Sequence, residues 1–188
     1  MCVASLSFAM NLEDGTKAFE SKDYKTALKV FEEFSLKGDA KAQYYLGSMY
    51  YYGEGVEKDS KKAFVWYEKA ASQGFADAQY NLGVMYYKGE GVEKDSKKAI
   101  EWYEKAASQG LAIAQFSLGL MYDKGEGVKK DIKKAFEWYE KAASQGLAEA
   151  QFSLGFMYYD RIGVKKDIKK AIECFEKAAS QGFADAQY

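Results

Sequence analysis

The side chains best suited to acid–base or nucleophilic chemistry in this chain are carboxylates and lysines. It carries 27 Lys and Arg, 28 Asp and Glu, and no histidine. Histidine is the commonest general base and transition-metal ligand, so the usual catalytic triads are missing. Glutamate precedes lysine by four residues at Glu101 and Lys105, Glu137 and Lys141, and Glu173 and Lys177. This order predicts surface ion pairs worth ~0.2–0.5 kcal/mol each. We therefore expect no catalytic residue, no metal and no cofactor.

Two short motifs resemble catalytic signatures but lack their defining residues. Gly89-Glu90-Gly91 precedes a predicted helix, yet the Gly-Lys-Ser/Thr ending of a phosphate-binding loop is absent. A serine β-lactamase would carry Ser-x-x-Lys, and the nearest match, Thr26-Ala27-Leu28-Lys29, lies on a predicted packing helix. Neither motif predicts an enzyme.

The composition is that of an ordinary folded chain: 188 residues, 48% hydrophobic, 29% charged, with a formal net charge of -1. No single-sign field is available to attract a phosphate backbone, so we expect no nucleic-acid partner. The lysine-rich segments 129–134 and 165–170 each contain an aspartate and are predicted to be solvated helix faces. No apolar run reaches the length of a membrane span.

The chain repeats itself every 36 residues. The dipeptide Ala42-Gln43 recurs as Ala78-Gln79, Ala114-Gln115, Ala150-Gln151 and Ala186-Gln187. Repeats of this length are supersecondary units that bury their apolar faces by stacking on their neighbours. The sequence therefore predicts an array of stacked units.

Each repeat reads as two helices joined by a turn. Residues 40–52 have apolar side chains at helical spacing, and the two glycines of Gly53-Glu54-Gly55-Val56 suit positive φ. Asp59 and Ser60 are placed to cap a second helix that runs to about Gln73, and Gly74 is placed to end it. Its apolar positions are Ala63, Trp66, Tyr67, Ala70 and Ala71.

Small residues recur where the two helices of a repeat should approach closely. Glycine fills one helix-interior slot in every copy, at Gly47, Gly83, Gly119 and Gly155. A helical glycine costs up to about 1 kcal/mol, so its recurrence indicates packing that offsets the loss. In the fourth copy Arg161 and Ile162 replace the loop Gly-Glu, so we expect that loop to differ in shape.

The cysteines and the N-terminus give weaker signals. Two cysteines, Cys2 and Cys174, cannot form the disulfide framework of small secreted domains. Cys174 occupies the slot that holds Trp66, Trp102 and Trp138 in the other repeats, so we expect it to be a small buried hydrophobic residue. Residues 1–9 end in Ser7-Phe8-Ala9, which has the small-x-small pattern of a signal-peptidase site. Two interpretations stay open. Residues 1–9 are the remnant of an export signal, and the protein is periplasmic or secreted, or they are a frayed terminus, and the protein is cytoplasmic.

The repeat pattern resembles a known family. Ala-x-Ala-Gln-x-x-Leu-Gly-x-Met-Tyr, Gly-x-Gly-Val-x-Lys-Asp and Lys-Ala-x-x-Trp-Tyr-x-Lys-Ala-Ala-x-x-Gly look like the Sel1-like repeat, a relative of the tetratricopeptide repeat. The resemblance implies an all-α, right-handed α/α superhelical solenoid whose bacterial and eukaryotic members mostly act as protein-binding adaptors. The expected segments are an N-terminal stretch 1–11, a shortened repeat 12–39, repeats 40–75, 76–111, 112–147 and 148–183, and the start of a further repeat 184–188.

A cysteine-rich branch of the same family suggests one alternative function. Its members are associated with penicillin binding and described as β-lactamases, and a cysteine pair typically staples successive repeats at slots that here hold Ala71 and Gln79. The pair is absent in every copy. A β-lactam-binding role therefore remains an alternative to the adaptor.

The first helix of each repeat varies along one stripe while the second helix stays nearly uniform. The varied slots step by four, three and four residues, so they share a helical face. We predict that this stripe lies on the concave face and binds a peptide or protein segment. The stripe is Lys41, Tyr45, Ser48, Tyr52, Asp77, Asn81, Val84, Lys88, Ile113, Ser117, Leu120, Lys124, Glu149, Ser153, Phe156 and Asp160.

Two competing interpretations of the array remain. In the first, some stripe positions, especially Val84, Leu120 and Phe156, turn inward and pack on the next repeat. In the second, the array is a spacer or self-assembling rod with no particular ligand. The chain also stops at Tyr188 without the polar capping repeat that solenoid ends normally need. We therefore expect Phe175 and Phe183 to be partly exposed, as in a truncated chain or one that self-associates through this face.

Overall fold

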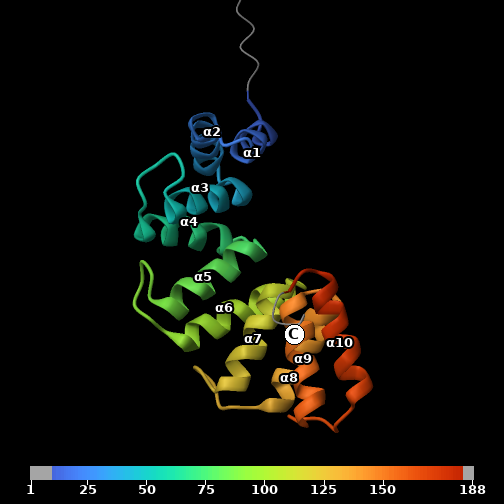
Figure 1. Cartoon of the computed structure of the whole chain (residues 1–188). Coiled ribbons are helices and arrows are strands. Elements are labelled where there is room, and N and C mark those ends of the chain that lie inside the picture. Colours follow the sequence, from blue (N-terminus) through green and yellow to red (C-terminus); the bar gives the residue numbers. More distant parts are fainter. Residues whose placement is uncertain (1–9, 184–188) are drawn as a thin grey trace, which may run out of the picture. The chain divides into compact units, whose positions relative to one another are not determined.

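The computed structural model describes residues 10–183, which form ten α-helices and no β-strand (Figure 1). The all-α fold of helix-turn-helix repeats is therefore confirmed. Predictions about Cys2, Ser7-Phe8-Ala9 and residues 184–188 lie outside the described residues. The helices are α1 (Leu12–Glu20), α2 (Tyr24–Leu36), α3 (Ala40–Tyr52), α4 (Ser60–Ser72), α5 (Ala76–Lys88), α6 (Ser96–Ser108), α7 (Ala112–Lys124), α8 (Ile132–Ser144), α9 (Ala148–Asp160) and α10 (Ile168–Ser180).

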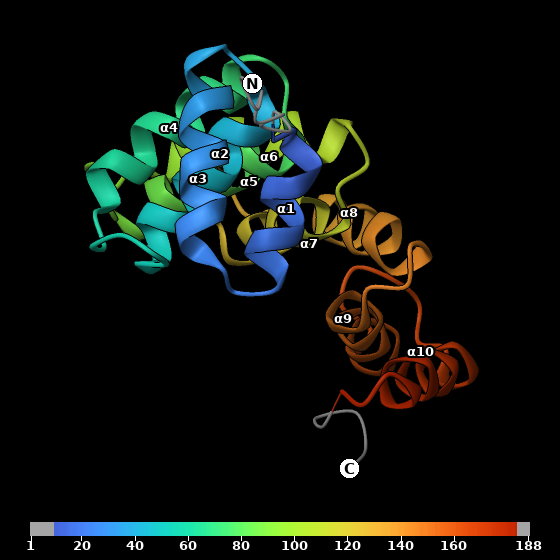
Figure 2. The same ribbon diagram turned by 90° about the horizontal axis from the view of Figure 1, so that it is seen from above.

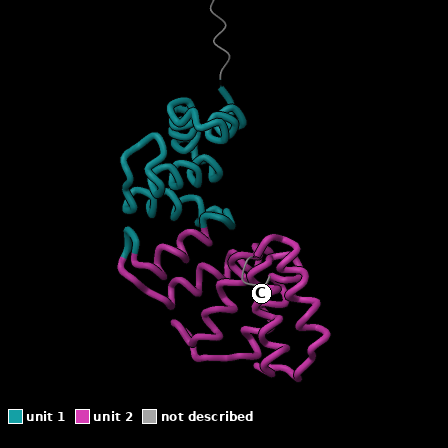
Figure 3. The backbone as a smooth tube through the Cα atoms, viewed as in Figure 1, with its two compact units in different colours: residues 1–78, 90–92 teal, residues 79–89, 93–188 magenta. Residues whose placement is uncertain are grey.

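The chain divides into two compact units (Figure 3). Unit 1 comprises residues 1–78 and 90–92, and unit 2 comprises residues 79–89 and 93–188. In unit 1, α1 packs on α2, α2 on α3 and α3 on α4. In unit 2, consecutive helices from α6 to α10 pack in the same way, and Figures 1 and 2 both show α9 beside α10. Within each unit, every helix therefore contacts its neighbours in sequence.

An aspartate begins the second helix of each repeat. Asp59 accepts a hydrogen bond of 3.0 Å from the Lys62 amide, and Asp131 accepts one of 3.1 Å from the Lys134 amide. These bonds satisfy amides that lack a partner inside the helix. The backbone hydrogen bond holds the pKa of Asp59 below its ordinary value. The predicted capping role of this aspartate is confirmed.

Left-handed residues end the helices, and the fourth loop keeps this geometry without glycine. Gly125 ends α7 at φ 74° and ψ 32°, while Arg161 ends α9 at φ 62° and ψ 31°. In both loops the backbone amide of the next residue donates a hydrogen bond to a methionine carbonyl. In α9 this bond runs from the Ile162 amide to the Met157 carbonyl at 3.0 Å. The expectation of a differently shaped loop was wrong, because this bonding holds Arg161 in a conformation that disfavours a side chain.

The recurring helical glycines lie directly against an aromatic ring, and the predicted close approach of the two helices is confirmed. A Cβ atom added at Gly47 would lie 2.7 Å from Tyr67 Cδ1, and one added at Gly83 would lie 2.5 Å from Tyr103 Cδ1. Real Cβ atoms essentially never show contacts this short. The absent side chain therefore allows α3 to approach α4, and α5 to approach α6. Ala63 and Ala70 are fully buried, as close approach requires.

Buried glutamines link each repeat to the one before it. Gln115 Nε2 donates to the Ala107 carbonyl at 3.2 Å, and Gln145 Nε2 donates to Gln115 Oε1 at 2.8 Å. The chain of bonds runs from the end of α8 through α7 to the end of α6. Because a buried polar group without a partner costs free energy, these hydrogen bonds allow the glutamine side chains to lie in the core.

The predicted Glu–Lys pairs on the second helices are not formed among the described residues. Lys105 Nζ instead lies 3.8 Å from the centroid of the Trp102 ring, and Lys141 Nζ lies 4.0 Å from that of Trp138. A lysine over a tryptophan face gains a cation–π attraction, which competes with an exposed ion pair. Cys174 fills the same tryptophan slot in α10 and is half-buried, and burial raises the pKa of its thiol.

The C-terminal aromatic residues pack against each other. Phe152 lies 5.6 Å from Phe175 and 5.1 Å from Phe183 between ring centroids, and the latter two are half-buried. Phe175 and Phe183 are thus partly exposed. No helix among residues 10–183 has the length and apolar character needed to cross a membrane.

Candidate partner-binding surface

The stripe on α3, in unit 1, is divided between surface and core. Lys41 and Tyr52 are exposed, the latter by 66%. The ring of Tyr45 stacks on Phe31 with centroids 4.8 Å apart, so one of its faces is buried. Ser48 is 6% exposed and hydrogen-bonds to the Tyr67 hydroxyl at 3.0 Å. The structure thus brings Lys41, Tyr45 and Tyr52 to the surface, where Asp77 is also exposed, and leaves Ser48 inside.

In unit 2 the stripe continues on α5, α7 and α9. The exposed members are Lys88, Lys124, Phe156 and Asp160, and the half-buried ones are Asn81, Val84, Ile113, Ser117, Leu120, Glu149 and Ser153. Val84 packs on the core cluster around Leu118, and Leu120 on the cluster around Leu154. Phe156 remains 44% exposed while contacting Phe152 and Phe175. These three residues therefore pack inward in part and keep some accessible surface.

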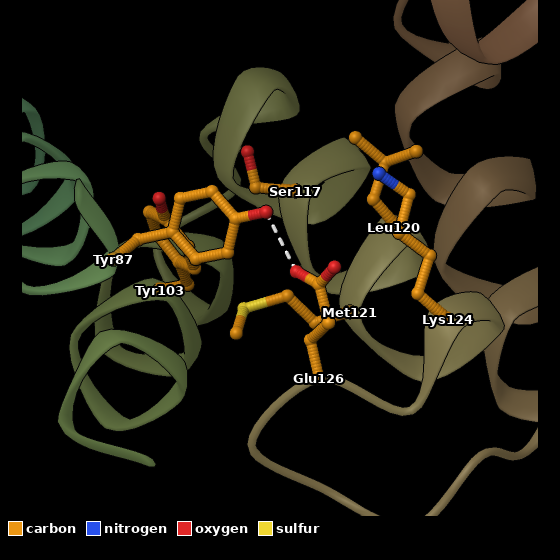
Figure 4. Close-up of a pocket in the computed structure, with 7 residues that line it drawn as sticks. All are labelled: Tyr87, Tyr103, Ser117, Leu120, Met121, Lys124 and Glu126. Atoms are coloured by element: carbon orange, nitrogen blue, oxygen red, sulfur yellow. Dashed lines mark hydrogen bonds between the residues drawn. The ribbon is translucent and has the colours of Figure 1, made fainter. Parts of the chain in front are cut away.

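Three stripe residues of α7 line one pocket. Ser117, Leu120 and Lys124 surround a space of about 80 Å³ together with Tyr87 from α5, Tyr103 from α6, and Met121 and Glu126 (Figure 4). The Tyr87 hydroxyl donates to Glu126 Oε2 at 2.6 Å across this pocket. The hydrogen bond raises the pKa of Tyr87. The space is the size of one short side chain, with rings and aliphatic groups on its walls.

The Tyr103 hydroxyl in this pocket lacks the partner that its counterpart in repeat 1 has. Tyr67 bonds to Ser48, but the slot of Ser48 is filled by Val84 in repeat 2. Among residues 10–183, the Tyr103 hydroxyl has no hydrogen-bond partner, although the residue as a whole is only 4% exposed. Burial raises its pKa. The Tyr103 hydroxyl therefore offers a hydrogen-bonding group in the wall of the pocket that no described side chain uses, and an occupant can bond to it.

Sequence reasoning missed four residues of the pocket. Tyr87, Tyr103, Met121 and Glu126 lie outside the predicted stripe, in slots that were assigned to packing or turns. A signal was present for one pair. Tyr87 and Glu126 correspond to Tyr51 and Glu90 one repeat earlier, and Asp123 and Ile162 replace both residues one repeat later. Paired replacement of this kind indicates spatial contact.

Comparison with known families supports the repeat assignment. The Sel1 repeat pattern matches residues 40–75, 76–111, 112–147 and 148–183. The chain belongs to the Sel1 repeat family. Sel1 repeat proteins generally serve as protein-interaction scaffolds.

Solved structures of Sel1 repeat proteins resemble this chain. A Sel1 repeat protein from Oxalobacter formigenes is 39% identical with a TM-score of 0.89, and the match covers 94% of this chain and 72% of that one. A protective antigen of uropathogenic Escherichia coli with an SLR fold is 42% identical with a TM-score of 0.82. That match covers 85% of this chain but 34% of the antigen, so the chain spans about a third of its length.

A cysteine-rich relative allows the disulfide slots to be compared. Helicobacter pylori cysteine rich protein B is 31% identical with a TM-score of 0.55, and the match covers 69% of this chain and 92% of that one. No curated protein matches the chain. In this Sel1 array, Ala107 and Gln115 fill the slots at which the cysteine-rich branch typically carries its cysteine pair, and they are joined by the glutamine hydrogen bond. Thr26 and Lys29, the nearest match to Ser-x-x-Lys, lie on α2.

Proposed function

We propose that this Sel1 repeat chain is a non-catalytic scaffold that binds a segment of a partner protein along the stripe of its first helices. One small side chain of that segment enters the pocket between α5, α6 and α7. The predicted concave face would carry the rest of the segment, with Phe156 as a further apolar contact.

The observation that carries this proposal is the convergence of Ser117, Leu120 and Lys124 on one pocket. These are varied positions, whereas positions needed only for stacking are uniform from copy to copy. The pocket offers apolar walls and the Tyr103 hydroxyl, which has no protein partner among the described residues. A few polar groups in a mostly apolar recess are the usual arrangement of a binding site.

Site-specific photo-crosslinking in the source cell tests the proposal. A crosslinking residue is placed at Lys124 or Asp160, which are exposed stripe positions, and at Glu104 or Glu140 as controls, which are exposed on the second helices. We expect a distinct crosslinked protein from the stripe positions alone. Equal crosslinking from the control positions would contradict the stripe, and crosslinks to the chain itself would favour a self-assembling rod.

A pocket-filling variant completes the test. Ser117→Phe adds a ring to the pocket without removing a core side chain, and Ser108→Phe adds the same ring at an exposed end of α6. We expect the crosslink at Lys124 to disappear with Ser117→Phe and to persist with Ser108→Phe. Far-ultraviolet circular dichroism verifies that both variants remain folded. A crosslink that survives Ser117→Phe would exclude the pocket from binding.

A further inference from the structure

The loop between the two helices of a repeat changes its charge along the chain. Counted from the residue that ends the first helix to the first turn of the second, residues 53–62 and 89–98 carry no net charge. Residues 125–134 carry a net charge of two positive units, and residues 161–170 carry four. The change arises where Lys129 and Lys165 replace Glu57 and Glu93, and where Arg161 and Ile162 replace Gly-Glu.

The two positive loops lie next to each other within unit 2. A Cβ atom added at Gly163 would lie 2.6 Å from Ile132 Cγ2, so the fourth loop rests on the first residue of α8. An open hollow of about 640 Å³ is found there. It is lined by Tyr122, Val128, Lys129, Lys130, Asp131, Ile132, Lys133, Lys134 and Gly163.

Several of the local charges already have partners. Lys134 Nζ lies 5.1 Å from the centroid of the Tyr122 ring, as Lys98 lies over Tyr86. Lys130 Nζ lies 4.0 Å from Asp123 Oδ1. The nearby carboxylates are also committed, since Asp131 caps α8 and Glu126 accepts the Tyr87 hydroxyl.

Four exposed lysines remain without such a partner. Within residues 10–183, Lys129, Lys133, Lys165 and Lys169 form no ion pair and lie over no aromatic ring. Like charges held together raise the free energy of the folded chain, and a binding anion relieves this repulsion. The geometry therefore favours a ligand that carries several negative charges.

We propose that these two loops form a second interaction surface, separate from the stripe, for an acidic protein segment that also carries an apolar side chain. Carboxylates of the segment would face Lys129, Lys133, Lys165 and Lys169, and the apolar side chain would enter the hollow against Val128 and Ile132. This inference does not depend on the proposed function of the stripe.

The lining of the hollow favours a protein segment over two other anionic partners. The apolar groups of the hollow, Val128 and Ile132, are half-buried in the wall of a recess, which a flat membrane surface would not enter. Ile162 and Ile168 of the fourth loop are 40% and 41% exposed, so vesicles are included in the test. Single-stranded nucleic acid is usually held by exposed aromatic rings on which bases stack. The ring that lines the hollow, Tyr122, is only 8% exposed, and the half-exposed ring of Tyr159 is already covered by Lys166, whose Nζ lies 5.0 Å from its centroid. An acidic peptide needs no exposed ring, and its apolar side chain can enter the recess.

Charge reversal in the full chain tests the surface. Lys129→Glu with Lys165→Glu restores the residue type found at positions 57 and 93, so the repeat itself demonstrates that the fold accepts it. The control, Lys61→Glu with Lys97→Glu, changes the net charge equally in the neutral loops. The probe is a labelled peptide of alternating glutamate and leucine, titrated by fluorescence anisotropy at low and high salt. Circular dichroism verifies folding.

We expect the unaltered chain to bind the peptide with an affinity that falls as salt rises. Lys129→Glu with Lys165→Glu should weaken binding by about tenfold or more, and the control by about twofold or less. A peptide with serine in place of leucine should bind more weakly. The proposal is overturned if the peptide does not bind, if both variants lose affinity equally, or if phosphatidylserine vesicles or a single-stranded oligonucleotide bind more tightly through the same lysines.

Discussion

The Tyr87 hydroxyl donates a hydrogen bond of 2.6 Å to Glu126 Oε2, which lies 39 residues later and in the next repeat. Tyr51 forms the same contact with Glu90, so the tyrosine–glutamate bond recurs at equivalent positions. At the following step the two slots hold Asp123 and Ile162, and Asp123 lies near Lys130 instead. A tyrosine–glutamate hydrogen bond therefore joins successive repeats, except between the third and fourth repeats, where other residues replace both partners.

A double-mutant cycle measures this contact. We expect Tyr87→Phe and Glu126→Ala to show a coupling of about 0.5–1.5 kcal/mol in the free energy of unfolding, because one hydrogen bond joins the two side chains. Urea unfolding monitored by circular dichroism supplies the values. The same cycle with Asp123→Ala and Ile162→Ala is the control, and its coupling should be close to zero.

Gly119→Ala tests the close approach of helices in repeat 3. A Cβ atom at Gly119 would overlap the Tyr139 ring, so we expect a destabilisation of about 1–3 kcal/mol. Helix propensity alone predicts the opposite sign, a gain of about 1 kcal/mol. Thermal unfolding decides between them. The loss should be smaller in a Tyr139→Leu background, and an equal loss there would argue against a clash with the ring.

Arg161→Gly should stabilise the chain. Arg161 is held at φ 62°, where an L side chain is disfavoured, and glycine adopts this conformation without that cost. We expect a gain of about 0.5–1 kcal/mol, after subtracting the larger entropy that glycine brings to the unfolded chain. Arg161→Ala is the control, since it retains a Cβ atom. A similar gain from alanine would assign the effect to the charge instead.

The cap at Asp59 predicts a pH dependence in acid. The pKa of Asp59 is lowered in the folded state, chiefly by the Lys62 amide. Its stabilisation is complete above the unfolded pKa of about 3.9 and is lost as pH falls through the lower folded pKa. Asn caps helices as well but does not titrate. Asp59→Asn should therefore lose less stability than the parent in urea unfolding from about pH 5 to pH 2.

The sequence predicted features that repeat and missed those that depend on competition between neighbours. Gly47 was recognised because a costly residue recurred, and the Tyr67 ring explains it. The pairing of Glu101 with Lys105 was wrong, since spacing alone does not reveal that Trp102 offers the lysine a face. The shape of the loop at Arg161 was wrong for a related reason: propensity was overruled by bonds from the adjoining backbone.

The stripe was predictable only as a set of varied positions. Its variation distinguished it from the uniform stacking residues. The variation did not show which of its members point outward. Ser48 varies and yet is buried, because its hydroxyl pairs with Tyr67. The pocket required the three-dimensional arrangement, since Tyr87, Tyr103 and Ser117 come from three different helices. Whether the stripe contacts a partner stays a prediction.

The glycine that faces an aromatic ring in each copy has an evolutionary consequence. The spacing of the two helices depends on a glycine and a ring within the same repeat instead of a covalent bridge. A duplicated repeat therefore contains both residues and needs no matching change in other repeats. Such genes can lengthen by tandem copying while a handful of side chains diverge. Divergence of ligand preference and growth in length can then proceed independently.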